Sequence, residues 1–471
     1  MLNIAVENII GLDEAEYSDL QKLINNYNDH AFKNAEKQKY YEGKITLNDV
    51  NLGIALPDGL RKLEIGCAWG AKTVDVLAAR SMFDGFVGAS GADVEELDQI
   101  AIDNDLINEY AKACRDELKL GCTFATLSSD PQIDVKIRFH SPMSAAALWD
   151  GQKGRIKCGF AIIDTVPDNS TNLNTWVPSL INYYTDNSIW VLHCEDSTWY
   201  AERKPHKLGR PWMVALIWNA TSDKPFGRSR IKEPIRRLID GYVRTIANAT
   251  IGLEFATSPQ KYLMGVTDEQ FEAVVSDKFR QYVGSIITST YNPDTGTVPT
   301  FGQLQQGSIA PHVEMLRILA TQFSAASGLT VTDTGVVNDA NPTSSDAILA
   351  QSQTLIAMAE QLNLGNGTSL RNIALMALAI KNRTTIEGLS EDQLEVIAHF
   401  KSPAMPSVAV TTDAAIKIAS VRENFANTDT FLEMIGFDKA QIRRIRSQEA
   451  QARGLNVINE LLNEESGGDT E

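Results

Sequence analysis

The sequence predicts a large α+β protein in which a strand-rich region is followed by a mostly helical one. Between residues 122 and 219, short apolar runs alternate with turn-forming clusters such as SSDPQID and YTDNS. From Ile156 to Ile162 the apolar side chains recur at every second position, which is typical of a strand with one buried face. After Ser229 the apolar residues recur at helical spacing instead. We therefore expect a layer of mostly antiparallel strands flanked by helices.

The helices follow from apolar spacing and from their start and stop signals. We expect them at about residues 12–43, 95–120, 229–257, 267–284, 309–328, 343–382 and 413–462. Thr267 and Gln270 form a capping box, and Gly284 suits the end of that helix. The segment IITSTYNPDTGTVPTFGQL that follows is expected to form a hairpin, because its Asn-Pro-Asp-Thr-Gly centre favours a turn. Two helices would then bracket this hairpin.

Composition limits the class of protein. The chain has 471 residues, of which 43% are hydrophobic, so it can build a sizeable core. Its formal net charge is −17 at pH 7. A monomeric protein that wraps DNA normally carries the opposite sign, because neutralised phosphates supply its affinity. If this chain meets DNA, we expect it not to hold DNA tightly.

The sequence signals for membrane insertion, secretion and disulfide formation all favour a soluble protein in a reducing compartment. The first residues lack a basic region, and the runs WMVALIW and IALMALAI are too short to span a bilayer, so we expect a soluble chain without a signal peptide. The cysteines are odd in number and show no CxxC pair, which favours buried thiols in a reducing compartment. They are Cys67, Cys114, Cys122, Cys158 and Cys194.

The segment LEIGCAWG (63–70) is the strongest enzyme-like signal. It resembles the glycine-rich loop of S-adenosylmethionine-dependent methyltransferases, where glycines let the backbone approach the cofactor. Ala68 replaces the middle glycine, however, and Trp69 would crowd the cofactor. The alternative interpretation is the start of a helix packed in the core, and we favour it.

Other catalytic and metal patterns are weak. Adjacent residues in the His193–Asp196 cluster would point to opposite faces of a strand, and no second ligand pair stands at a usual spacing. The chain has no HExxH, no GxxxxGK[ST] and no GxSxG motif. A triad assembled from distant residues stays open at this level. We expect no catalytic residues, no metal and no cofactor.

Cations gather in the stretch from Thr221 to Phe255, before and within a predicted helix. One interpretation is a solvated face whose arginines pair with neighbours such as Glu233 and Asp240. The other is a contact with another subunit or with phosphate. The residues expected to make such a contact are Arg228, Arg230, Arg236 and Arg237.

Four segments in order carry a family resemblance: YYEGK (40–44), KPFGRSRI (224–231), FGQLQQGSIAPHVEMLRILATQFSAASGLTV (301–331) and NPTSSDAILAQSQTL (341–355). Over residues 12–455 the chain resembles the portal proteins of tailed bacteriophages, in the branch that includes siphophages of Gram-positive hosts. The resemblance implies a portal fold with wing, stem, clip and crown regions.

The resemblance also implies the function. Portal proteins form a ring, usually of twelve subunits, at one capsid vertex, and a separate terminase ATPase pumps double-stranded DNA through it. The chain is thus expected to be a non-enzymatic channel for DNA packaging and ejection, located in the virion and assembled in the host cytoplasm. The implied partners are further copies of itself, the terminase large subunit, head-completion or adaptor proteins, and the major capsid and scaffolding proteins, with no membrane. The alternatives are a methyltransferase or another head-morphogenesis protein.

Each region has a candidate segment. The wing would cover 1–266 (β-rich at about 122–219) and 343–411, the latter with a long kinked helix. The stem helices would cover 267–284 and 309–329, the clip 285–308, the tunnel loop 330–342, the helical crown 412–462 and a disordered acidic tail 463–471.

Two sets of site residues follow from these regions. The tunnel-loop set is Thr330, Thr332, Asp333, Thr334, Val336, Val337, Asn338, Asp339 and Asn341. The clip set, expected to bind partners, is Thr288, Tyr291, Asn292, Asp294, Thr297 and Phe301. The loop contains no lysine or arginine, so it can contact sliding DNA without a strong electrostatic hold.

Overall fold

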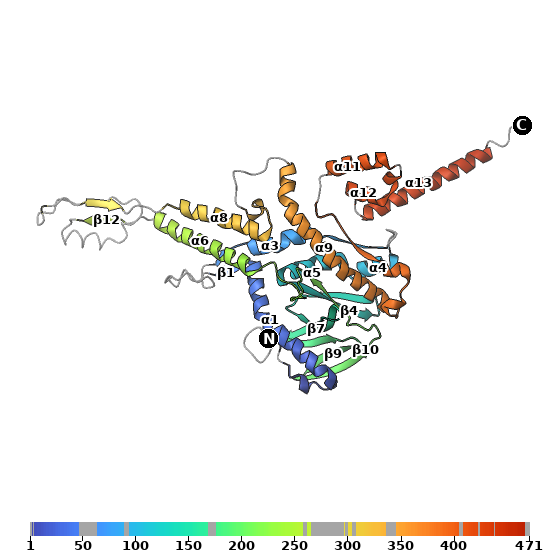
Figure 1. The fold of residues 1–471 in the computed structure, drawn as a ribbon, viewed down its shortest axis with the longest axis horizontal. Helices are drawn as coiled ribbons and strands as arrows, with labels where there is room; N and C mark the ends of the chain where they lie inside the picture. Colours follow the sequence, from blue (N-terminus) through green and yellow to red (C-terminus); the bar gives the residue numbers. More distant parts are fainter. Residues whose placement is uncertain are drawn as a thin grey trace.

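The computed structural model describes residues 2, 4–46, 64–88, 94–167, 176–257, 261–264, 296, 300–303, 308–335, 345–404, 408–422, 424–437 and 439–466. Figure 1 shows a body of strands and helices from which a pair of helices extends on one side and a C-terminal helix on the other. The predicted α+β class is confirmed.

Two antiparallel sheets form the strand-rich region, as the sequence predicts. The five-stranded sheet has the order β10-β9-β8-β7-β6 and the three-stranded sheet the order β11-β4-β5. The strands are β4 (Cys122–Asp130), β5 (Asp134–His140), β6 (Ala145–Asp150), β7 (Arg155–Pro167), β8 (Trp176–Tyr184), β9 (Ser188–Glu195), β10 (Thr198–Pro205) and β11 (Met213–Ile217). Two-stranded pairs join more distant segments: β1 (Lys44–Thr46) with β2 (Glu64–Gly66), β3 (Phe83–Val87) with β14 (Ile397–Phe400), and β12 (Lys261–Met264) with β13 (Thr300–Gln303).

Both faces of the five-stranded sheet are covered, which explains its apolar sequence. Cys158 and Phe160 pack on one face with the N-terminal residues and α1 (Glu14–Glu42). Ile156 and Ala161 belong to the cluster on the other face, which Phe124 of the three-stranded sheet completes. The alternation predicted from Ile156 to Ile162 therefore breaks at the β-bulge opposite Leu148 and Trp149.

The helices follow the prediction along most of the chain and differ where a local break was not visible in the sequence. They are α3 (Trp69–Ala78), α4 (Glu95–Asp103), α5 (Leu106–Leu120), α6 (Glu233–Thr257), α8 (Ala310–Ser327), α9 (Ser345–Lys381), α10 (Glu391–Leu394), α11 (Val408–Val421), α12 (Asp429–Ile435) and α13 (Lys439–Ser466). The 3₁₀ turns of the described residues are η1 (Val6–Asn8), η2 (Thr332–Thr334), η3 (Ile386–Gly388) and η4 (Phe425–Asn427).

Particular residues account for the breaks. The predicted helix 95–120 is two helices, because the Asn104 side chain binds Val135 O and Ile137 N of β5 and Asp105 adopts a positive φ of 47°. Gly43 ends α1 in the left-handed conformation, as predicted. The C-terminal helical section consists of α11, α12 and α13, with Gly436 at φ 105° after α12.

Helix α9 is the central buried element of the body. From Leu370 to Ala379 it is buried on nearly all sides, between the three-stranded sheet and the helices α3 and α4. This is the run IALMALAI, whose apolar character all round is typical of a core helix and not of an amphipathic surface helix. Four of the five cysteines are also buried as expected, whereas Cys194 is half-exposed.

A buried polar cluster joins α5 to α9. Asn366 of α9 donates its amide hydrogens to Glu117 Oε2 at 2.8 Å and to Tyr110 Oη at 3.0 Å. Both Glu117 and Asn366 have no exposed surface. Burial raises the pKa of the Glu117 carboxyl to about 8, because the charged form loses its hydration. The folded protein therefore keeps Glu117 protonated at pH values where the unfolded chain ionises it.

We predict that Glu117→Gln changes the pH dependence of stability. In the wild type, the folded state binds the extra proton between the unfolded pKa near 4.5 and the folded pKa near 8, so stability falls as pH rises through that window. The slope from this group is about 1.4 kcal/mol per pH unit. A glutamine side chain does not titrate, so the substitution should remove this slope, which urea denaturation at pH 5, 6, 7 and 8 would measure.

Glu109→Gln, on the same helix in a surface ion pair with Lys112, is the matched control and should leave the slope unchanged. A wild-type slope that persists in the Glu117→Gln variant would contradict the assignment of the buried proton to this residue.

Candidate channel and assembly sites

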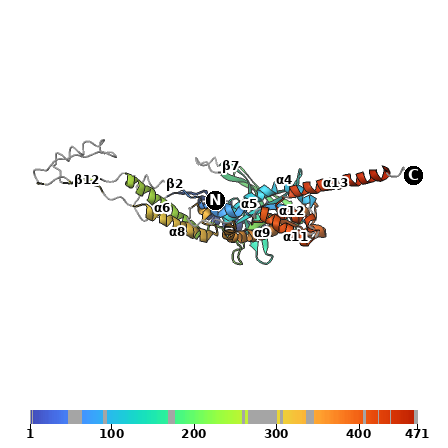
Figure 2. The ribbon, with the colours of Figure 1, turned by 90° about the horizontal axis from the view of Figure 1, so that it is seen from above.

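Helices α6 and α8 lie side by side and extend from the body together (Figures 1 and 2). Their shared face is apolar: Ile235, Ile239, Val243 and Ala247 recur every four residues on α6 and are buried. Gly241 allows close approach, since a Cβ there would lie 3.2 Å from Leu319 of α8. The outward ends of the two helices lead to β12 and β13, which pair with each other. The chain thus goes out along α6 and returns along α8.

The outward part of α8 exposes large apolar side chains. Val313, Met315 and Ile318 are each 44–45% exposed. Isolated exposed apolar residues are common, but a group within two turns of a projecting helix indicates a contact surface.

Trp69 anchors this helix pair to the body. Its ring stacks on Phe323 of α8 with 4.6 Å between centroids and contacts Tyr242 of α6 at 4.7 Å. Its Nε1 donates to Thr334 O at 3.2 Å. Trp69 is the first residue of α3, and at Gly70 a Cβ would lie 2.1 Å from Tyr40 O. The segment LEIGCAWG therefore starts a helix packed in the core, which was the favoured interpretation, and the space beside Gly70 is filled by backbone.

Arg230 is buried where α3, α8 and α9 meet. Its guanidinium donates to Thr73 O at 2.6 Å and to Ser327 O at 2.7 Å, and it lies over the ring of Trp218. Ser327 is the last residue of α8, where the unpaired carbonyls of a helix favour a cation. Burial lowers the pKa of Arg230 to about 10. Arg230 is 6% exposed, so the expectation that it contacts another subunit or a phosphate is wrong.

The rest of KPFGRSRI also serves the fold. Gly227 has a φ of 70°, and a Cβ there would lie 2.1 Å from Trp218 O. Ser229 Oγ donates to Lys119 O at 2.5 Å and accepts from Ile231 N at 2.9 Å, so the loop is bound to the last turn of α5. The motif fixes the direction in which α6 leaves the body.

The other three arginines of the predicted set are at least partly exposed and have partners within the chain. Arg228 pairs with Asp223 at 3.6 Å, Arg236 with Glu36, and Arg237 with Glu233 at 2.7 Å. The interpretation as a face paired with acidic neighbours therefore describes these side chains in the single subunit. Arg237 remains 77% exposed.

The described part of the predicted tunnel loop is a folded turn. After α8 ends at Gly328 in the left-handed conformation, Asp333 Oδ2 accepts from Thr330 N at 3.0 Å and from Thr330 Oγ1 at 2.8 Å. Thr334 is buried and its hydroxyl donates to Val331 O, whereas Thr332 is exposed. The other candidates, Val336, Val337, Asn338, Asp339 and Asn341, lie outside the described residues.

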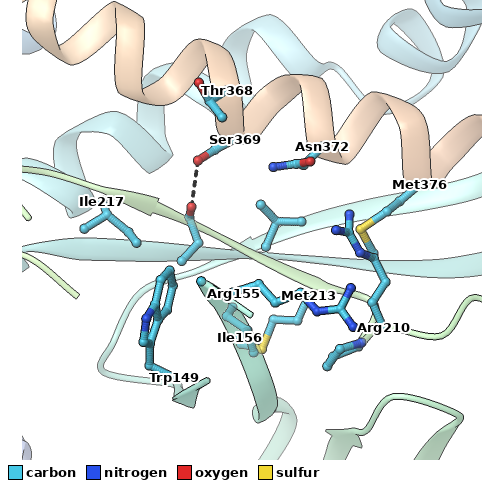
Figure 3. Close-up of a pocket in the computed structure, with 14 residues that line it drawn as sticks. Trp149, Arg155, Ile156, Arg210, Met213, Ile217, Thr368, Ser369, Asn372 and Met376 are labelled. Atoms are coloured by element: carbon cyan, nitrogen blue, oxygen red, sulfur yellow. Dashed lines mark hydrogen bonds between the residues drawn. The ribbon is translucent and has the colours of Figure 1, made fainter. Parts of the chain in front are cut away.

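A small cavity lies between α9 and the sheets (Figure 3), with a volume of about 190 Å³. Met213, Ile156 and Met376 line it together with Arg155 and Arg210, and the Ser369 hydroxyl is used by a hydrogen bond of 2.8 Å to Ala215 O. None of its described lining residues is an acid, a histidine or a cysteine, so they hold no pair for general acid–base chemistry.

The described residues contain neither a metal-binding cluster nor a membrane-spanning helix. No three His, Cys, Asp or Glu side chains in that part of the chain lie close enough together to hold a metal ion. Within the same residues, no helix has both the length and the apolar character needed to cross a membrane.

Comparison with protein families decides the identity of the chain. The family described as "Phage portal protein, SPP1 Gp6-like" matches residues 20–454. This chain belongs to the phage portal family. No curated protein matches it.

Solved structures resemble this portal chain only in outline. They include "Virion of native gene transfer agent (GTA) particle" (12% identity, TM-score 0.43, covering 78% of this chain and 89% of that one) and "Neck of empty GTA particle computed with C6 symmetry" (13%, 0.44, 75% and 86%). A third is "Neck of native GTA particle computed with C12 symmetry" (12%, 0.43, 78% and 89%).

The predicted clip at 285–308 falls mostly outside the described residues. The predicted first stem helix at 267–284 does so too, as do Thr288, Tyr291, Asn292, Asp294 and Thr297. Phe301 lies in β13, opposite Leu263 of β12. The predicted second stem helix at 309–329 corresponds to α8. Among the described helices, the one beside α8 is α6, which the sequence analysis assigned to the wing.

Sequence reasoning missed the structural roles of Trp69 and Arg230, the residues that hold the helix pair on the body of the portal subunit. A signal existed in each case. A tryptophan at the start of a helix, between small residues, indicates tight packing, and the second arginine of GRSRI lies beside the strongly apolar Ile231. Neither signal identifies the distant partners at Phe323 and Ser327.

We predict that Arg230→Met destabilises the subunit by about 2–4 kcal/mol, because Thr73 O and Ser327 O lose charged donors while buried. Arg237→Met is the matched control, because its ion pair with Glu233 lies at the surface, is screened by solvent and should contribute little to stability. Urea denaturation followed by tryptophan fluorescence would compare the two. Equal effects of the two substitutions would show that Arg230 has no special structural role.

Proposed function

We propose that this portal chain assembles into a ring of about twelve subunits that forms the channel for double-stranded DNA during packaging and ejection. Membership of the portal family carries the proposal. The projecting pair α6–α8 supports it, because a projecting element with exposed Val313, Met315 and Ile318 needs neighbours to cover it.

We assign the stem to α6 and α8. They extend together from the body and lead to the β12–β13 pair, beyond which the clip would lie at about residues 265–299. The wing then consists of the two sheets with α1, α3, α4, α5 and α9, and the crown of α11, α12 and α13. The clip residues named from the sequence would bind terminase and, later, a head-completion or adaptor protein.

The tunnel loop would lie between α8 and α9, at residues 330–342. Its described end offers DNA the exposed Thr332, while Asp333 is engaged with Thr330 and Thr334 is buried. No lysine or arginine occurs in this segment, and the chain carries a net charge of −17. Such a loop contacts DNA through polar and apolar atoms, which allows the duplex to slide.

The remaining assignments follow from the same proposal. The ring would sit at one vertex of the capsid in the virion after assembly in the host cytoplasm, next to the major capsid and scaffolding proteins. Arg228, Arg236 and Arg237 stay candidates for contacts with a neighbouring subunit. The protein would have no enzymatic activity of its own, since a separate terminase supplies the work of packaging.

We predict that the purified protein forms rings of about twelve subunits. Native mass spectrometry would give the mass, and negative-stain images of the same sample would show a central hole. The protein should hydrolyse no ATP. A chain that remains monomeric at high concentration and in the presence of scaffolding protein would contradict the proposal.

We also predict that Ile318→Glu on α8 prevents ring formation while leaving the subunit folded, because the side chain is exposed in the single subunit. Lys22→Glu on α1, whose side chain is 62% exposed, is the control and should assemble normally. If Ile318→Glu forms rings of unchanged mass and abundance, this face of α8 is not part of the interface.

A further inference from the structure

A basic groove lies between α1 and the loop that precedes α6. It has a volume of about 560 Å³, in the range of sites that enclose a compact ligand, about 300–1,000 Å³. Its cationic lining residues are Lys33, Lys37, Lys224, Arg228, Lys232 and Arg236, and Glu233 is the one acid among the described residues that line it. In a chain of net charge −17, this is an unusual concentration of cations.

Some of these cations lack a counter-ion in the described part of the chain. Arg228 and Arg236 have the acidic partners given above, and Lys37 donates to Leu120 O at 3.2 Å. Lys33, Lys224 and Lys232 are exposed and form no ion pair with any described residue. These three lysines are therefore available to an acidic partner.

The floor of the basic groove is apolar. Ala145, Ala146 and Ala147 of β6 line it together with Phe226. Successive side chains of a strand point to opposite faces, so a groove that touches three in a row runs along the edge of the strand. β6 is the outer strand of the five-stranded sheet. Ala146 packs toward the cluster beside α1, whereas Ala145 and Ala147 pack toward the three-stranded sheet.

The same sheet ends in a two-stranded ribbon, formed by Asp164–Pro167 of β7 and Trp176–Pro178 of β8. Val166 pairs with Val177, and Pro167 pairs with Trp176. The pairing of β6 with β7 ends at Ala161, and the pairing of β9 with β8 ends at Leu180. Neither neighbouring strand therefore extends along the ribbon. Figure 2 shows β7 at the margin of the body.

The ribbon is apolar and acidic. Trp176 is 64%, Val166 44% and Val177 39% exposed. Asp164 lies on the ribbon. At the same end of the sheet, Glu195 is the last residue of β9 and is 73% exposed, and Asp196 lies in the turn that follows. No lysine or arginine occurs from residue 164 to residue 178. Because large apolar side chains gathered on an exposed surface mark an interaction site, we expect another surface to cover them.

We propose that the β7–β8 ribbon of one subunit inserts into the basic groove of the next, with Trp176 over the alanine floor and the carboxylates against the free lysines. The inference rests on the proposed ring. A ring needs a heterologous interface, in which two different and complementary surfaces of the same chain meet. The ribbon and the groove are such a pair in charge and in apolar character. The occupant of the groove is therefore a second copy of this chain.

Two other occupants fit less well. The ribbon cannot fill the groove of its own subunit, because it continues the sheet away from Ala145 and its side chains are exposed in the single chain. Duplex DNA would bring phosphates to the lysines but nothing to cover the apolar floor. A ribbon with carboxylates and an exposed tryptophan can pair with the lysines and also cover the apolar floor.

Photo-crosslinking tests this contact directly. The photoreactive residue p-benzoylphenylalanine replaces Trp176 in the full-length chain, the rings are purified and irradiated, and the cross-linked peptides are mapped by mass spectrometry. We expect links between subunits, from position 176 to residues 26–37 or 224–236. Rings whose cross-links map elsewhere, or only within one chain, would overturn the insertion while leaving the ring intact. A protein that forms no oligomer would overturn both proposals.

Charge reversal gives a second test with a matched control. Lys33→Glu with Lys232→Glu should weaken ring formation by about tenfold or more, since like charges would then meet at the interface. Lys22→Glu on α1 changes the same kind of exposed charge outside the groove and should have little effect. Adding Asp164→Lys and Glu195→Lys should restore assembly. Unchanged assembly of the reversed groove, or loss of DNA binding in its place, would overturn the proposal.

Discussion

The projecting helix pair depends on one buried cation. Arg230 has no carboxylate partner in the described structure; backbone carbonyls of α3 and α8 and the ring of Trp218 hold its charge. A buried charge is costly unless every donor finds an acceptor, so this arrangement tolerates little displacement of either helix. Because Ser327 ends α8 and the chain enters α6 just after Arg230, the same contact sets both the start of α6 and the end of α8.

Trp69 extends this constraint to the candidate channel loop. It contacts the rings of Phe323 and Tyr242 and donates a hydrogen bond to Thr334 O, so the α6–α8 pair and the turn after α8 share one anchor in the body. In a ring built from such subunits, we expect the stem and the tunnel loop to move as one unit with α3. Contacts with DNA would then be made by the rest of the loop, and contacts with partner proteins by the clip.

The sequence predicts those parts of the fold that depend on local periodicity. The strands between 122 and 219, α1 with its stop at Gly43, α8, and the apolar run in α9 are of this kind. The role of Arg230 cannot be predicted from local periodicity, because its partners lie 97 and 157 residues away. The local pattern of charges favours an exposed face instead. The pairing of α6 with α8 is also not predictable from local sequence, because only their contact in the folded chain shows it.

The cations that this acidic chain concentrates around α6 mostly serve contacts within the subunit. Arg230 is used inside the subunit, and Arg236 and Arg237 are paired with Glu36 and Glu233. None of these guanidiniums is left to hold DNA, and the remaining surface is acidic enough to repel it. Cations that stay unpaired face a groove with an apolar floor, where a protein partner gains more than a phosphate backbone does. In the proposed ring, the basic stretch would thus stabilise the subunit and its assembly, and a channel through which DNA slides would not need it to hold the duplex.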